Sequence, residues 1–263
     1  MKFSVLGPLK ITQDGTPIQI GGLNQRATLG YLLLYANETV GVSQLVRALW
    51  GESEPRTARK MLHNAVAGLR RTLSLQADSP SAPQLLTNAP GYALRVGDGD
   101  VDLARFRIAA AHGHALVAAG SWQYASVTLR EALALWRGNA LADLVEEGIH
   151  WPELAAVQNS RLAVIEDWSD AEINNGIYHE VIDVLSSVVE IDPLRERSCH
   201  QLMLALYRSG RQADALGVYR RTRTILLERF GLDPGRELQQ LEHAILNHDP
   251  VLDGVSADRY ASR

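Results

Sequence analysis

The 263-residue sequence predicts a mainly α-helical protein with small β elements: an N-terminal winged helix-turn-helix of the OmpR type and a C-terminal all-α, tetratricopeptide-like helical array. Three observations predict this fold class. Three helical patterns near the N-terminus precede a hairpin signal, which is the element order of a winged helix. From residue 103 onward the pattern is helical throughout. Glycines there recur where the second helix of each pair begins.

The N-terminal elements follow from caps, turns and periodicity. A first hairpin is predicted where 3–11 and 17–20 flank a Gln-Asp-Gly-Thr turn at 13–16. Three helices follow, with polar residues suited to N-caps at Asn24, Ser43 and Thr57. A second hairpin brackets Asn-Ala-Pro-Gly, in which we expect Gly91 to supply a positive φ. The predicted helices are 24–35, 44–50 and 57–73, and the hairpin strands are 85–87 and 92–96.

The third predicted helix carries two different faces. At about 100° per residue, one stripe is apolar and wide enough to pack on a core. The opposite face presents Lys60, Asn64 and Arg71 and has no carboxylate. An ordinary solvated helix mixes acids with bases, because such pairs one turn apart stabilise it. Cations, an amide and small residues instead suit a helix that lies between phosphates and reaches base edges. The apolar stripe consists of Ala58, Leu62, Ala65, Val66, Leu69 and Leu73.

We therefore expect this helix to enter the major groove of duplex DNA, with the wing against the neighbouring groove. A plain basic surface helix is the alternative. Lys60, Asn64 and Arg71 would meet bases or adjacent phosphates, and the flanking cations would meet the backbones. The candidate DNA-binding residues are Arg56, Thr57, Arg59, Lys60, His63, Asn64, Arg70, Arg71, Thr87 and Asn88.

Charge divides the chain in the same way. Residues 1–98 hold ten Lys and Arg against six Asp and Glu, whereas the remainder holds sixteen against twenty-four. A pI of 6.1 therefore conceals halves of opposite sign. An excess of four cations is modest, but six of the ten lie in the recognition helix, its leading turn and the wing. The positive half is the one predicted to bind a polyanion.

The C-terminal part predicts stacked helix pairs. Gly120, Gly176 and Gly210 each precede a second helix, and the last two are 34 residues apart, the tetratricopeptide period. Each pair would bury its apolar face on the next. The groove of such an array can hold a peptide, a ligand or a partner domain, or the array can serve for dimerisation, and the sequence leaves these options open. The predicted helices are 103–119, 122–136, 151–174, 178–190, 195–208, 212–230 and 235–247.

The sequence contains few patterns typical of catalytic or metal-binding sites. The sequence has no phosphate-binding G-x-x-x-x-G-K, no G-x-S-x-G and no H-E-x-x-H. The aspartates at 98, 100 and 102 resemble the start of a calcium loop, but Leu103 and Ala109 stand where such a loop needs Gly and Glu. Cys199 is interpreted as a small core residue. We expect no enzyme activity, cofactor or metal. Without a signal peptide or an apolar run long enough to span a membrane, we expect a cytoplasmic protein.

Particular segments resemble the Streptomyces antibiotic regulatory protein family. They are the FSVLGPLKI start, the LVRALWGE stretch, the LHNAVAGLRRTL helix, the TNAPGYALRV wing and the long block from LYRSGRQADALGVYRRTRTILLERF to the end of helix 235–247. The last block resembles the bacterial transcriptional activator domain. The resemblance covers about residues 1–250. It implies a DNA-binding domain at 1–98, an activator domain at 99–250 and a polar, disordered tail at 251–263. Asn88 stands where the family commonly carries Arg, so the wing lacks that cation.

The resemblance also implies a function. The chain would bind direct repeats in double-stranded promoter DNA, with two protomers side by side, and recruit the RNA polymerase holoenzyme through its sigma factor and alpha subunit to a secondary-metabolite gene cluster. Glu52 and Glu54, in the loop before the recognition helix, would contact the polymerase; a solvated turn is the alternative. Two other functions stay open at this point: a ligand-responsive repressor, and a tetratricopeptide adaptor whose N-terminal domain binds protein.

Overall fold

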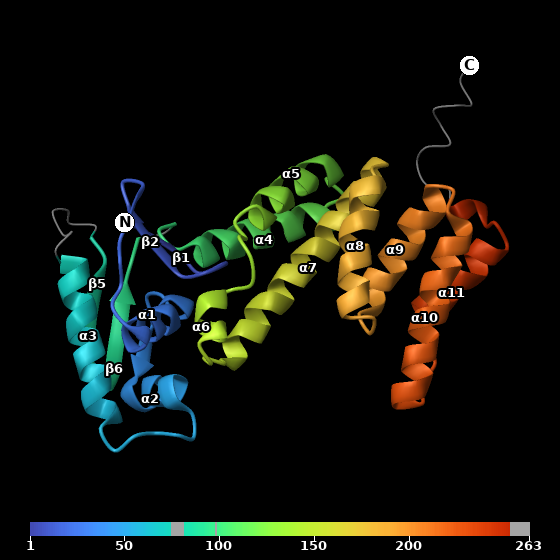
Figure 1. The fold of residues 1–263 in the computed structure, drawn as a ribbon. Coiled ribbons are helices and arrows are strands. Elements are labelled where there is room, and N and C mark those ends of the chain that lie inside the picture. The colour runs from blue at the N-terminus through green and yellow to red at the C-terminus, as the bar shows by residue number, and fades with distance from the viewer. Residues whose placement is uncertain (75–81, 98, 253–263) are drawn as a thin grey trace. The chain divides into compact units, whose positions relative to one another are not determined.

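The structure is a computed structural model that describes residues 1–74, 82–97 and 99–252 (Figure 1). The chain divides into two compact units, the first of residues 1–110 with 131–161 and the second of residues 111–130 with 162 onward. The fold class predicted from the sequence is confirmed, with helices predominating and two small sheets in the first unit. In the described part of the chain, no helix is both long and apolar enough to cross a membrane.

The first unit begins with a three-stranded antiparallel sheet in the order β1-β2-β3. The sequence predicted a single arm over 3–11, but Phe3 pairs with Ile11, so this arm is itself a hairpin. Asp14 and Gly15 adopt positive φ in the second turn, as its sequence suggests. The strands are β1 (Lys2–Ser4), β2 (Lys10–Gln13) and β3 (Thr16–Pro17).

Three helices of the first unit pack against one another, and α1 is their centre, since every residue from Ala27 to Leu34 is buried. Asn24 and Ser43 are not N-caps, contrary to the prediction. Each helix instead starts after an extended glycine, Gly22 or Gly41, and neither start has a side-chain cap. Each predicted capping residue therefore lies inside the first turn. The helices are α1 (Leu23–Leu34), α2 (Val42–Trp50) and α3 (Ala58–Ser74).

The wing belongs to a second sheet, with strands in the order β4-β6-β5. Gly91 does not have a positive φ, contrary to the prediction. It is glycine because the strands lie too close for a side chain: a Cβ on Gly91 would be 1.8 Å from the Val40 carbonyl oxygen. Close approach of backbones is the other common reason for a strand glycine. The strands are β4 (Thr39–Gly41), β5 (Gln84–Asn88) and β6 (Gly91–Arg95).

A helical segment completes the first unit and fixes the N-terminal sheet. The buried Asp102 carboxylate accepts hydrogen bonds from the backbone N–H groups of Val5 and Leu6, at 2.8 and 3.1 Å. Asp102 thus tethers the start of α4 to the segment that follows β1. A short helix, α6, was not predicted, because five residues are too few to show a period. The elements that contribute are the start of α4 (Asp102–Ala118), α6 (Ala142–Glu146) and the start of α7 (Pro152–Asn175).

The second unit contains the repeat that the sequence predicted. Gly120, Gly176 and Gly210 have φ of 68°, 79° and 80°. After each, the next N–H donates to the carbonyl five residues earlier, at 2.9 Å in all three cases. This is the Schellman ending, which needs a left-handed residue and so favours glycine. The remaining helices are α5 (Trp122–Leu133), α8 (His179–Ile191), α9 (Glu196–Arg208), α10 (Gln212–Phe230) and α11 (Arg236–Leu246).

The predicted tail at 251–263 lies outside the described residues from 253 onward, as do Asp98 and most of the polar loop before β5. The boundary between residues 98 and 99 stays a prediction.

Candidate nucleic-acid interface

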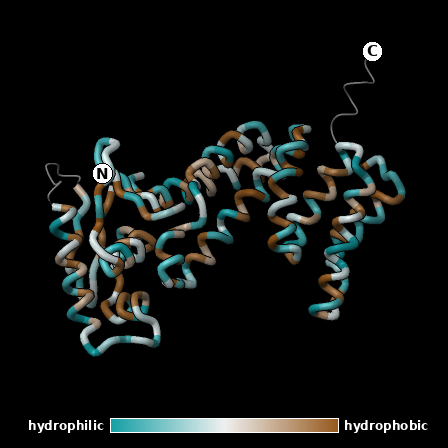
Figure 2. The backbone as a smooth tube through the Cα atoms, viewed as in Figure 1, coloured by the Kyte–Doolittle hydropathy of each residue, from teal (hydrophilic) through white to brown (hydrophobic). Residues whose placement is uncertain are grey.

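Helix α3 has the two faces that its sequence predicts. All six residues of the apolar stripe are buried, between 0 and 3 % exposed. In Figure 2, hydrophobic and hydrophilic residues alternate turn by turn along this helix. At 1.5 Å per residue its 17 residues extend for about 25 Å, enough to follow a major groove through several base pairs. The exposed polar residues on α3 and just before it are Arg56, Thr57, Arg59, Lys60, His63, Asn64 and Arg71.

The exposed face of α3 is positive and without internal neutralisation. Within the described residues, no carboxylate oxygen lies within 4.0 Å of a side-chain nitrogen of Arg56, Arg59, Lys60 or Arg71. The helix itself contains no acid. These cations therefore keep their full charge for an external anion, and no ion pair within the described part of the unit has to break first.

One of the three arginines within α3 behaves differently. Arg70 is half-buried, and its Nε donates to the Leu85 carbonyl oxygen at 2.9 Å while Nη2 donates to Thr87 Oγ1 at 2.7 Å. Its guanidinium also lies 5.8 Å from the centre of the Tyr92 ring. The planar fork of arginine suits two such acceptors. Arg70 thus joins the recognition helix to both strands of the wing.

The wing residues are exposed but also engaged. Thr87 accepts the hydrogen bond from Arg70, and the Asn88 Nδ2 donates to Thr39 Oγ1 at 2.7 Å. Of the ten predicted DNA-binding residues, seven therefore project from α3 and its leading turn, and three form the contacts that fix the wing. Sequence periodicity placed Arg70 on a flank of the helix correctly, but it could not show which strand that flank meets.

One packing contact that sequence reasoning missed sets the position of α3. The Gln25 side chain of α1 lies directly over Gly68, where a Cβ would come within 2.4 Å of Gln25 Nε2. Gly68 is buried, although it does not belong to the apolar stripe of α3. A hollow of about 340 Å³ borders this contact, and Asn64 lines it together with the first turn of α1. Unpaired backbone N–H groups at a helix start attract phosphate oxygens, so α1 adds a second anion-attracting feature beside the α3 face.

The loop between α2 and α3 is exposed and acidic. Gly51 ends α2 with a φ of 56°, and Glu52 and Glu54 follow with no cation recorded within 4.0 Å among the described residues. The two carboxylates are thus available to an external partner, on the loop that leads directly into the cationic helix.

Comparison with known proteins identifies the family to which the chain belongs. The sequence model of the bacterial transcriptional activator domain matches residues 101–246. The regulatory protein DnrI of Streptomyces peucetius is 34 % identical over 258 residues, which cover 96 % of this chain and 94 % of that protein. The chain belongs to the Streptomyces antibiotic regulatory protein family. The resemblance seen in the sequence is confirmed, and members of this family are transcriptional regulators.

Longer members of the family share the same region. The transcriptional regulatory protein EmbR of Mycobacterium tuberculosis is 38 % identical over 251 residues, and the regulatory protein AfsR of Streptomyces coelicolor is 37 % identical over 262. The chain spans 64 % of EmbR and 25 % of AfsR. A solved structure of M. tuberculosis EmbR, in complex with a low-affinity phosphopeptide, superimposes with a TM-score of 0.85 and covers 95 % of this chain and 65 % of that one.

Proposed function

We propose that the chain is a sequence-specific DNA-binding transcriptional activator. In this proposal α3 enters the major groove of each of two direct repeats near a promoter, and the bound protomers recruit RNA polymerase to a secondary-metabolite gene cluster. The observation that carries the proposal is the α3 face: 17 helical residues with no acid, a buried apolar stripe on the inner side, and outer cations that pair with no carboxylate of the described residues.

The residues suit the two kinds of contact that DNA recognition requires. Asn64 and Arg71 are two turns apart, and an amide and a guanidinium can each form paired hydrogen bonds with adenine and guanine edges. Arg59 and Lys60 supply charge for phosphates on either side of the groove. Arg70 contributes by holding the wing at a fixed position against α3. The proposed site of action is the cytoplasm, where promoter DNA is found.

The arrangement on DNA follows from the architecture of the proposed complex. Direct repeats about one helical turn apart would place two protomers side by side in the same orientation, whereas a palindrome would place them about a two-fold axis. Recruitment of polymerase would use the sigma factor and the alpha subunit, and the exposed Glu52 and Glu54 are candidates for contact with a basic surface. The helical second unit would supply the remaining protein contacts.

The experiment selects duplexes from a random pool with the full chain, maps the bound sites by footprinting, and measures affinity by fluorescence anisotropy for the wild type, Arg71→Ala and Lys10→Ala. Arg71 and Lys10 are both exposed cations of the first unit, but only Arg71 is on α3. We expect Arg71→Ala to cost about 1–3 kcal/mol of binding free energy and Lys10→Ala to cost much less. Equal affinity of the two variants would refute the proposed contact, and the absence of duplex binding at low salt would refute the function.

A further inference from the structure

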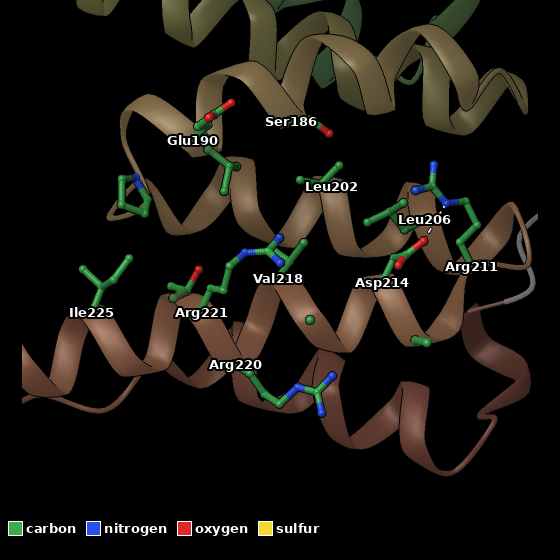
Figure 3. Close-up of a pocket in the computed structure, with 15 residues that line it drawn as sticks. Ser186, Glu190, Leu202, Leu206, Arg211, Asp214, Val218, Arg220, Arg221 and Ile225 are labelled. Carbon is green, nitrogen blue, oxygen red and sulfur yellow. Dashed lines mark hydrogen bonds and ion pairs between the residues drawn. The ribbon is translucent and has the colours of Figure 1, made fainter.

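Three helices of the second unit form a groove that the DNA-binding proposal does not use. It has a volume of about 710 Å³, and α8 and α10 form its walls while α9 forms its floor (Figure 3). The floor is apolar: Leu202 and Leu206 of α9, with Val218 of α10, are 2 to 4 % exposed. Pro193 and Ile225, which also line the groove, are half-buried. The groove therefore combines an apolar base with partly exposed apolar side chains.

Arg220 and Arg221 both line the groove, but only the Arg221 side chain extends over its apolar base, whereas Arg220 extends away from it (Figure 3). The Arg221 side chain extends from α10 toward Val218 and Leu206 (Figure 3), and within the described residues no carboxylate lies within 4.0 Å of it. Arg211, at the other end of the same wall, is already paired with Asp214 at 2.8 Å. Gly217 lies beside Arg221, since a Cβ there would be in van der Waals contact with Arg221 Nη1 at 3.6 Å, and a longer side chain would reach further into the groove. An unpaired guanidinium over apolar carbons favours a carboxylate attached to an apolar body.

We propose that this groove binds an acidic amphipathic peptide segment of a protein partner. One carboxylate of the segment pairs with Arg221, and an apolar side chain one turn away covers the half-buried Pro193 and Ile225. This mode is the helix-in-groove recognition in which apolar anchors recur at helical spacing. The inference goes beyond DNA binding and does not depend on it, since every residue that it uses lies in the second unit.

The size and charge of the groove decide between possible occupants. The lining residues of α10 run from Arg211 to Ile225, about 21 Å at 1.5 Å per residue, which accommodates about four turns of a peptide helix. Glu190 and Asp214 also line the groove. Asp214 is paired with Arg211, so the lining charges without an ion pair among the described residues are Arg220, Arg221 and Glu190. A phosphate backbone carries no apolar group for the apolar part of the lining, whereas a peptide with one or two acids and spaced apolar side chains matches both features.

The test is a selection from an mRNA-display library of random 15-residue peptides on the immobilised full-length chain, followed by anisotropy with the synthetic selected peptides. The blocking variant is Gly217→Leu, which fills the groove, and the charge variant is Arg221→Glu. Arg229→Glu is the matched control, because Arg229 is an exposed arginine of the same helix outside the lining. Far-UV circular dichroism and thermal unfolding check that each variant is folded, and DNA binding is measured in parallel.

We expect enrichment of sequences that combine acids with spaced apolar residues. Gly217→Leu should abolish binding of those peptides, and Arg221→Glu should weaken it about tenfold or more, with Arg229→Glu within twofold of the wild type. Replacement of the peptide's Glu by Gln should weaken binding to the wild type and not to Arg221→Glu. If no acidic sequences are enriched, or if folded Arg221→Glu binds them as the wild type does, the proposal is wrong. We expect every one of these variants to bind DNA with the affinity of the wild type. A loss of DNA binding would therefore bear on the DNA-binding proposal and not on the proposal for the groove.

Discussion

Arg70 of the recognition helix donates to Thr87 of the wing at 2.7 Å, while its neighbour Arg71 is exposed and makes no such contact with the described residues. Two adjacent arginines in one helix thus have different roles, because successive side chains point about 100° apart. The Arg70 guanidinium stabilises the fold, whereas the Arg71 guanidinium is available to bind DNA. The proposed interface therefore depends on a residue that need not touch DNA itself.

Replacement of each arginine should separate these roles. Arg70→Ala leaves the Leu85 carbonyl and the Thr87 hydroxyl without their donor, so we expect about 1–3 kcal/mol loss in the free energy of unfolding. Arg71→Ala should change it by less than about 0.5 kcal/mol, as expected for an exposed site. Urea denaturation followed by circular dichroism measures both. Equal free energies of unfolding for the two variants would show that the hydrogen bonds from Arg70 to the wing do not stabilise the fold.

The paired glycines of the wing sheet should tolerate alanine very differently. Gly41 and Gly91 are directly opposite in register. A Cβ on Gly91 would be 1.8 Å from the Val40 carbonyl oxygen, whereas one on Gly41 meets no atom within 4 Å. We expect Gly91→Ala to cost about 3 kcal/mol or more, since the strands must separate, and Gly41→Ala to stay within about 1 kcal/mol. Thermal unfolding of both variants measures the difference. A mild effect of Gly91→Ala would mean that β4 does not lie as close to β6 as the structure shows.

Glu153 links α7 to α1 and should make the stability of the first unit depend on pH. Its carboxylate accepts hydrogen bonds from the hydroxyls of Tyr31 and Tyr35 at 2.6 and 2.8 Å. Burial by itself raises the pKa of Glu153, but the donated hydrogen bonds outweigh burial and place the pKa below its ordinary value of 4.5. A carboxyl with a lowered folded pKa stabilises the fold above the unfolded pKa. That stabilisation is lost as the pH falls below about 4.5 and through the folded pKa.

Glu153→Gln should therefore lower the free energy of unfolding at pH 7, and the difference from the wild type should shrink as the pH falls below 4.5. Glu146→Gln is the control, because Glu146 is exposed and has no recorded side-chain partner in the described part of the chain. Urea unfolding at several pH values provides the measurement. A difference that stays constant down to pH 3 would contradict the role assigned to the ionised carboxylate.

Much of the fold was predictable because its patterns are local. The apolar stripe of α3 follows from helical periodicity alone, and every member is buried. The three Schellman glycines were visible because the same ending recurs. By contrast, Asn24 and Ser43 are good capping residues that the chain does not use, since a glycine precedes each helix in an extended conformation. Local preference identified the helix but misplaced its first residue.

What the sequence could not provide was contact between distant segments. The pairing of Arg70 with the wing, of Gln25 with Gly68 and of Asp102 with the N-terminal strand depends on how the elements pack. Gly91 shows the same limit, because a turn glycine and a close-approach glycine are identical in the sequence. The sequence predicted a groove in the helical array but not the residues that line it. That Arg221 extends over an apolar floor could be learned only from the positions of three helices.

The acidic loop before α3 permits a test of activation apart from DNA binding. Glu52 and Glu54 are exposed and adjoin the proposed DNA-binding helix without belonging to it. If they contact a basic polymerase surface, changing both to Ala should reduce activated transcription in vitro several-fold. Affinity for the operator should remain the same or rise slightly, because two negative charges near the DNA are removed. The matched control replaces Asp14 and Glu38, exposed or half-exposed acids of the same unit, by Ala. Full activation by the Glu52 and Glu54 double variant, with normal DNA binding, would assign polymerase contact to another surface and leave this loop as a solvated turn.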